Sequence, residues 1–64
     1  MFDSIFNELL SDYEKCFSCD NRNARSFIFY IKCSISILVK YESITTDTAY
    51  NLLCKALEYS YNFG

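Results

Sequence analysis

The sequence predicts an all-α protein, a small antiparallel bundle of three helices in one domain spanning residues 1–64. Apolar residues recur every three or four positions along most of the chain, which is the spacing of one helix face. Proline is absent and Gly64 is the only glycine, so the residues that make hairpin turns are nearly missing. Two short polar connections divide the chain, and we expect helices at about 2–17, 23–42 and 46–63.

The first segment draws a single apolar stripe along a helix. Its apolar residues are spaced by three and four positions; they are Phe2, Ile5, Phe6, Leu9, Leu10, Tyr13 and Phe17. Acidic residues near its start suit the positive end of the helix dipole. A polar cluster follows that can end this helix and cap the next; it comprises Ser18, Asp20, Asn21 and Asn23.

The middle segment allows two interpretations. Apolar side chains alternate from Phe27 to Val39 as in a strand, and β-branched residues are frequent. On a helix, a mostly polar stripe recurs every three or four residues; it comprises Arg25, Phe29, Lys32, Ser36, Lys40 and Ser43. Length favours the helix, because a strand typically runs about five or six residues and nothing between Ala24 and Tyr41 would turn the chain back.

The last segment begins with a capping signal. Thr45, Thr46 or Asp47 can accept the free amide hydrogens of the first turn, and Ile44 can pack back against the helix as a staple. Beyond this start a narrow polar stripe continues; it comprises Thr48, Asn51, Lys55, Glu58 and Asn62. A third helix is therefore expected, with its remaining sides apolar.

Cys16 and Cys19 stand at the CxxC spacing of zinc sites and dithiol redox centres. A structural zinc site needs four converging ligands, but Cys33 lies about ten residues, or roughly 15 Å, into the second helix, and histidine is absent. We therefore expect no metal and no cofactor, and we interpret Cys16, Cys33 and Cys54 as small buried hydrophobes. Cys19 lies in a polar loop near Arg22, where we expect a reactive surface thiol.

Catalysis and nucleic-acid binding are both disfavoured by composition. Without histidine, and with too little chain to enclose a cavity, the protein is not expected to be an enzyme or to bind a small-molecule substrate. The second and third helices could mimic a helix-turn-helix, yet the third offers only Lys55 against Asp47 and Glu58. The net charge of -2 is also opposite to the usual nucleic-acid footprint.

The chain shows no membrane signal. Its amino end has no basic segment ahead of the apolar residues, and the longest apolar stretch, from Phe27 to Val39, is interrupted and too short to cross a bilayer. We expect a cytoplasmic protein, in the host cytoplasm if a phage encodes it.

Aromatic residues are in surplus. Six Phe and six Tyr are more rings than so small a bundle can bury. Phe29 is the clearest case, because it interrupts the polar stripe with Arg25 before it and Lys32 after it, and such clusters anchor protein interfaces. The candidate partner-binding residues are Arg25, Phe29, Lys32, Lys40 and Tyr59. The expected partner is another protein, or a second copy in a homodimer.

These features favour a non-enzymatic protein that binds and inhibits or modulates a protein partner. Asn, Lys, Ile, Tyr and Phe are frequent, a bias typical of AT-rich phages and mobile elements. An inhibitor of a host defence factor, of the anti-CRISPR or anti-restriction kind, is therefore the leading hypothesis. The alternatives are a small DNA-binding transcriptional regulator and an immunity or antitoxin protein.

Overall fold

The computed structural model describes residues 2–63, and these residues are mostly helical. The helices are α1 (Phe2–Cys16), α2 (Ala24–Lys40) and α3 (Thr46–Ser60), with short 3₁₀ turns at Cys19–Asn21 and Tyr61–Phe63. The described residues contain no strand, so the predicted all-α class is confirmed and the strand interpretation of the middle segment is wrong.

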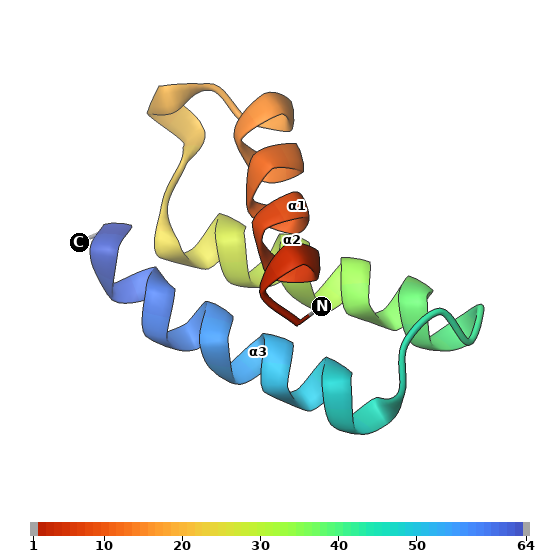
Figure 1. Cartoon of the computed structure of the whole chain (residues 1–64). Coiled ribbons are helices and arrows are strands. Elements are labelled where there is room, and N and C mark those ends of the chain that lie inside the picture. Colours follow the sequence, from red (N-terminus) through yellow and green to blue (C-terminus); the bar gives the residue numbers. More distant parts are fainter. Residues whose placement is uncertain (1, 64) are drawn as a thin grey trace.

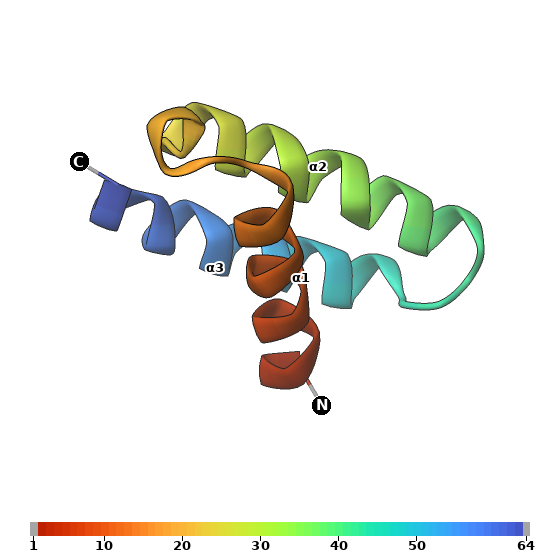
Figure 2. The ribbon, with the colours of Figure 1, turned by 90° about the horizontal axis from the view of Figure 1, so that it is seen from above.

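The three helices are arranged as a hairpin with one helix laid across it. α2 and α3 lie side by side and run in opposite directions, and α1 crosses them at a steep angle (Figure 1 and Figure 2). The predicted antiparallel relation thus holds for α2 and α3, whereas α1 lies across the pair. Figure 1 shows the carboxyl end of α1 projecting beyond the hairpin, and the end of the hairpin that carries the α2–α3 connection extends past α1.

The core lies where α1 crosses the hairpin. All three helices contribute to it, with Phe6, Leu9 and Tyr13 from α1, Phe27 and Ile31 from α2, and Leu52 and Ala56 from α3. Aromatic rings connect the helices, since the Tyr13 ring lies 5.1 Å from that of Phe27 and the Phe6 ring lies 5.8 Å from that of Tyr59. Edge-on ring pairs of this kind add to the hydrophobic gain of burial. The apolar stripe predicted for the first helix is therefore the face that packs.

Side-chain hydrogen bonds hold the turn between α1 and α2. Asn23 caps α2 by accepting from the Ser26 amide at 2.9 Å, and Ser26 Oγ accepts from the Asn23 amide, which completes a capping box. The buried Tyr13 hydroxyl accepts from the same Asn23 amide at 3.1 Å and bonds to Ser26 Oγ. One phenol therefore ties α1 to the start of α2.

Arg22 closes the carboxyl end of α1. Its Nε donates to the Phe17 carbonyl at 3.0 Å, and its guanidinium also donates to the Glu14 carbonyl. The last carbonyls of a helix lack intrahelical partners, and a cation suits the negative end of the helix dipole. Asn23 of the predicted polar cluster caps α2 as expected, whereas the residue that closes α1, Arg22, lies outside that cluster.

The α2–α3 connection ends one helix and starts the other within five residues. The Ser43 amide donates to the Leu38 carbonyl at 2.8 Å and the Glu42 amide to the Val39 carbonyl at 3.0 Å, which is the Schellman pattern. Glu42 takes the left-handed conformation of this motif, with φ of 59°. Thr45 then caps α3, accepting from the Thr48 amide at 3.2 Å, and Ile44 packs against the core.

The observed helices are slightly shorter than the predicted ones. α2 starts after its cap, Asn23, and stops at Lys40 because the left-handed Glu42 cannot continue a right-handed helix. α3 stops at Ser60, where the chain tightens into the Tyr61–Phe63 turn.

Candidate functional site

The polar stripe predicted along the second helix faces solvent. Its members Arg25, Phe29, Lys32, Ser36 and Lys40 are all exposed. The Phe29 side chain is 57% exposed, a large fraction for a phenylalanine on a helix that also carries the fully buried Phe27. The structure therefore places four of the predicted partner-binding residues on one open face of α2: Arg25, Phe29, Lys32 and Lys40.

Phe29 belongs to a longer apolar ridge that the sequence reasoning missed. Four exposed residues follow one another at intervals of four, three of them on α2 and the last at its C-cap. We call them the α2 ridge: Phe29, Cys33, Ile37 and Tyr41. Ile37 is 57% exposed and Tyr41 is 71% exposed. Side chains four apart on a helix form the ridges that pack into the grooves of another helix. This spacing is visible in the sequence and could have identified the ridge once Phe29 was singled out.

Two of the cysteine predictions are wrong. Cys33 is exposed on the α2 ridge and Cys16 is exposed at the end of α1, whereas both were expected to be buried. Cys16 is the last residue of α1, and the carboxyl end of this helix projects beyond the hairpin (Figure 1). Cys33 is exposed because α1 and α3 pack on other sides of α2. Cys54 is half-buried, in partial agreement with its predicted place.

A row of cations runs along one side of the α2 ridge. We call Arg25, Lys32 and Lys40 the basic flank; at 100° per residue they cluster on the side of α2 adjoining Phe29. Lys40 Nζ also lies 5.9 Å from the centre of the Tyr41 ring, where a cation and an aromatic face attract. The α2 sequence contains no Asp or Glu, so this face is locally positive although the chain carries a net charge of -2.

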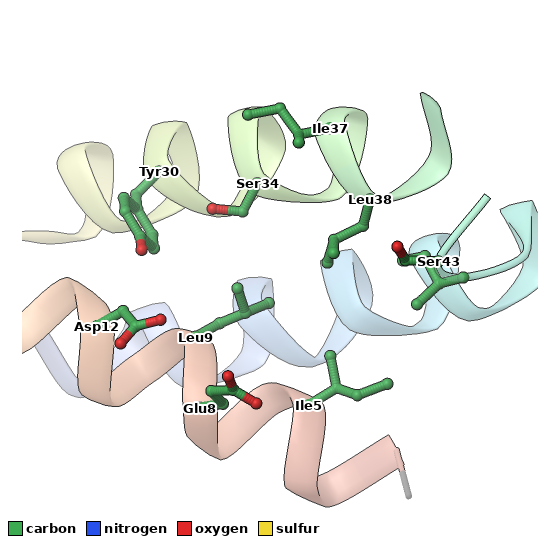
Figure 3. A pocket seen from close by; sticks show the side chains of 10 residues that line it. Ile5, Glu8, Leu9, Asp12, Tyr30, Ser34, Ile37, Leu38 and Ser43 are labelled. Carbon is green, nitrogen blue, oxygen red and sulfur yellow. The ribbon is translucent and has the colours of Figure 1, made fainter. Parts of the chain in front are cut away.

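An apolar groove with an acidic rim lies on the other side of the ridge. The groove has a volume of about 430 Å³ and lies between α1, α2 and the α2–α3 connection (Figure 3). Its apolar lining is Ile5, Leu9, Ile37, Leu38 and Ile44. Glu8 and Asp12, one turn apart on α1, provide the acidic rim, and Ile37 belongs both to the groove and to the ridge.

The Asp12 side of the groove is close enough to affect a neighbouring phenol. Burial raises the pKa of Tyr30, the negative charge of Asp12 raises it further, and a hydrogen bond with Ser34 offsets part of the rise. Tyr30 therefore stays protonated at neutral pH and keeps a hydroxyl donor in the groove wall. The negative charges of this site are the carboxylates of α1.

Tyr59, the fifth predicted partner-binding residue, lies inside the ring cluster. It is half-buried and its ring centre is 5.5 Å from that of Phe27 and 5.6 Å from that of Phe63. Most of its surface is used within the molecule, so the structure does not bring it together with Phe29. Three other residues near or on α3 are more exposed, namely Tyr50, Leu57 and Tyr61.

The CxxC segment shows exposed thiols. Cys19 is exposed, and Arg22 Nη1 donates to its sulfur at 3.5 Å, as expected from their spacing in the loop. Its reactivity stays a prediction. Within residues 2–63, no group of three or more metal-ligating side chains is placed to hold an ion.

The cation of α3 is engaged by α1. Lys55 Nζ lies 2.6 Å from an Asp3 carboxylate oxygen and 4.9 Å from the centre of the Phe6 ring. A groove-entering helix needs cations directed at phosphates. The contact with Asp3 therefore weighs against α3 as a DNA-reading helix.

Comparison with known proteins gives no relative from which function could be transferred. No protein-family model, curated protein or solved structure matches the chain significantly. Among the residues that the structure describes, no helix has the length and apolar character needed to span a bilayer. We therefore infer function from the geometry and charge of the surface.

Proposed function

We propose that this protein acts by binding another protein through the α2 ridge and its basic flank, and that it inhibits or modulates that partner without catalysing a reaction. The observation that carries the proposal is the exposure of Phe29, Ile37 and Tyr41 in one line along α2 and its C-cap. Burying such side chains in a partner gives about 25 cal/mol per Å² of apolar surface removed from water.

The composition of this surface supports a protein as the target. Aromatic residues and arginine supply most of the binding energy at protein interfaces, and Phe29 lies one turn from Arg25 and close to Lys32. The basic flank adds selectivity for a partner with acidic residues beside its apolar contact. An inhibitor needs only such affinity, because covering a partner's surface blocks its activity.

The size and composition of the chain support a particular kind of inhibitor. A 64-residue chain whose amino-acid composition is typical of AT-rich coding DNA suits a phage or mobile-element inhibitor of a host defence factor, of the anti-CRISPR or anti-restriction kind. An immunity or antitoxin protein would use the same physical means against a toxin.

The proposal is tested by comparing two variants, each of which replaces an exposed aromatic residue by glutamate. Phe29→Glu replaces a ridge residue, and Tyr50→Glu replaces an aromatic residue on α3 that is 68% exposed. Each tagged variant is used to capture proteins from the native host, and the proteins retained are quantified by mass spectrometry. We expect Phe29→Glu to reduce capture of the specific partner at least about tenfold, and Tyr50→Glu to leave it unchanged.

Circular dichroism of both variants excludes unfolding as the cause. A partner retained equally by the wild type and by folded Phe29→Glu would contradict the proposal. Loss of the partner only with Tyr50→Glu would move the docking surface to α3.

A further inference from the structure

The open face of α2 carries three strips of different chemistry. The α2 ridge runs between the basic flank on one side and the groove rimmed by Glu8 and Asp12 on the other. Positive charge, apolar surface and negative charge thus follow one another across a single face of the molecule. A surface of this kind is electrostatically complementary to itself.

Symmetry decides how two such faces can meet. A dimer with a two-fold axis uses the same patch on both subunits. If the two α2 helices run antiparallel, the axis brings basic flank beside basic flank, and like charges repel. If they point the same way, with the axis along α2, the basic flank of each copy lies beside the acidic rim of the other.

We propose that a second copy of this chain covers the α2 ridge, with the two α2 helices side by side and pointing in the same direction. Phe29 and Ile37 of each copy then pack against the ridge of the other, and Arg25 and Lys32 lie opposite Glu8 and Asp12. This inference rests on the proposed function, because it takes the same ridge as the docking surface. The second copy occupies the ridge in the free protein, and a host protein that binds there displaces it.

Two further features favour a second copy as the occupant. A chain of 64 residues buries only about 60% of the surface that it exposes when unfolded, so association adds needed burial. The ridge also exposes three large apolar side chains, Phe29 and Ile37 on α2 and Tyr41 at its C-cap, and an obligate interface resembles a core cut in half.

Charge reversal on each side of the ridge provides the test. One full-length variant carries Arg25→Glu with Lys32→Glu, and the other carries Glu8→Lys with Asp12→Lys. The self-association of each purified protein is measured by sedimentation equilibrium, at low and high salt. We expect the wild type to dimerise and each variant alone to lose at least about tenfold in dimer affinity, because like charges then face each other. Mixed in equal amounts, the two variants are expected to pair to within about threefold of the wild-type affinity.

The mixture also guards against misfolding, since only folded variants can restore pairing. A wild type that stays monomeric at millimolar concentration would overturn the inference, as would variants that dimerise as tightly as the wild type or whose mixture stays unpaired. Preferential pairing of the Arg25→Glu, Lys32→Glu variant with the wild type would overturn it too. In an antiparallel arrangement the two flanks face each other, so the reversed flank of the variant would attract the basic flank of the wild type.

The outcome is separable from that of the host capture. A monomeric wild type that still captures a host protein through Phe29 would end the second-copy inference and leave the proposed function standing. If the wild type dimerises and the mixed variants pair again, but no host protein depends on Phe29 for capture, the second-copy inference stands and the proposed function falls.

Discussion

Glu42 holds a backbone conformation that is unfavourable for a residue with a Cβ atom. Its φ of 59° is required by the Schellman motif that ends α2, a position where glycine is the usual residue. We expect Glu42→Gly to raise the free energy of unfolding by about 0.5 to 1 kcal/mol, because relief of the left-handed strain exceeds the added entropy of the unfolded chain. Chemical denaturation measures the change.

Glu42→Ala is the matched control for that prediction. Alanine also lacks the carboxylate but keeps the Cβ atom, so we expect little change in stability. If alanine stabilised the protein as much as glycine, the carboxylate and not the backbone would be responsible.

At the scale of the helix, the docking of α1 depends on one phenol. The hydroxyl of Tyr13 is bonded to the Asn23 amide and to Ser26 Oγ, and its ring is fully buried. We expect Tyr13→Phe to lower the free energy of unfolding by about 1 to 2 kcal/mol, since the ring still fills its place but the polar groups at the start of α2 lose a partner. Thermal and chemical unfolding provide the measurement.

Tyr61→Phe serves as the control for the Tyr13 substitution. Tyr61 is 85% exposed, so removing its hydroxyl should leave stability unchanged. Equal stability of Tyr13→Phe and the wild type would show that water replaces the phenol at the capping box without cost.

The sequence was sufficient to predict the helices but not how they meet. Periodicity placed Phe6, Leu9 and Tyr13 on one face, and capping chemistry limited the helix starts to short polar segments that contain the observed caps, Asn23 and Thr45, because both signals are local. The angle at which α1 crosses the hairpin depends on contacts between residues far apart in the sequence, and helical periodicity gives no information about such contacts.

The same limit explains the errors at the candidate site. An apolar position on a helix is buried only if another element covers it, and helical spacing does not say how many neighbours a helix has. Cys33 was therefore assigned to the interior although it lies on the open face of α2. Phe29 was placed correctly because its polar neighbours Arg25 and Lys32 already indicated solvent.

At the scale of the whole molecule, an ion pair joins α1 to α3. Asp3 on α1 and Lys55 on α3 are 52 positions apart, and the hydrogen bond from Lys55 lowers the pKa of the Asp3 carboxyl below its ordinary value of 3.8. A carboxyl with a lowered folded pKa stabilises the fold fully above its unfolded pKa, and this contribution is lost as pH falls through the folded pKa. We expect Asp3→Asn to remove this part of the acid-induced loss of stability, with a small effect because Asp3 is exposed.

Two measurements check the ion pair. Unfolding of the wild type and Asp3→Asn is followed from pH 7 to the acid limit, and the pKa of Asp3 is measured by NMR in the wild type and in Lys55→Gln. We expect the Asp3 pKa to rise toward 3.8 in Lys55→Gln. An unchanged pKa in that variant would assign the lowered value to another cause.

The crossing of α1 over the hairpin has a consequence for how the chain acquires its fold. α2 and α3 are adjacent in sequence and joined by a short connection, so bringing them together costs little chain entropy. The apolar surface on which α1 packs forms only when Phe27 of α2 and Leu52 of α3 are in place together. Of these three helices, α1 leaves the ribosome first and is therefore expected to dock last. Until it docks, a newly made chain exposes the apolar surface of α2 and α3 that α1 covers in the folded protein.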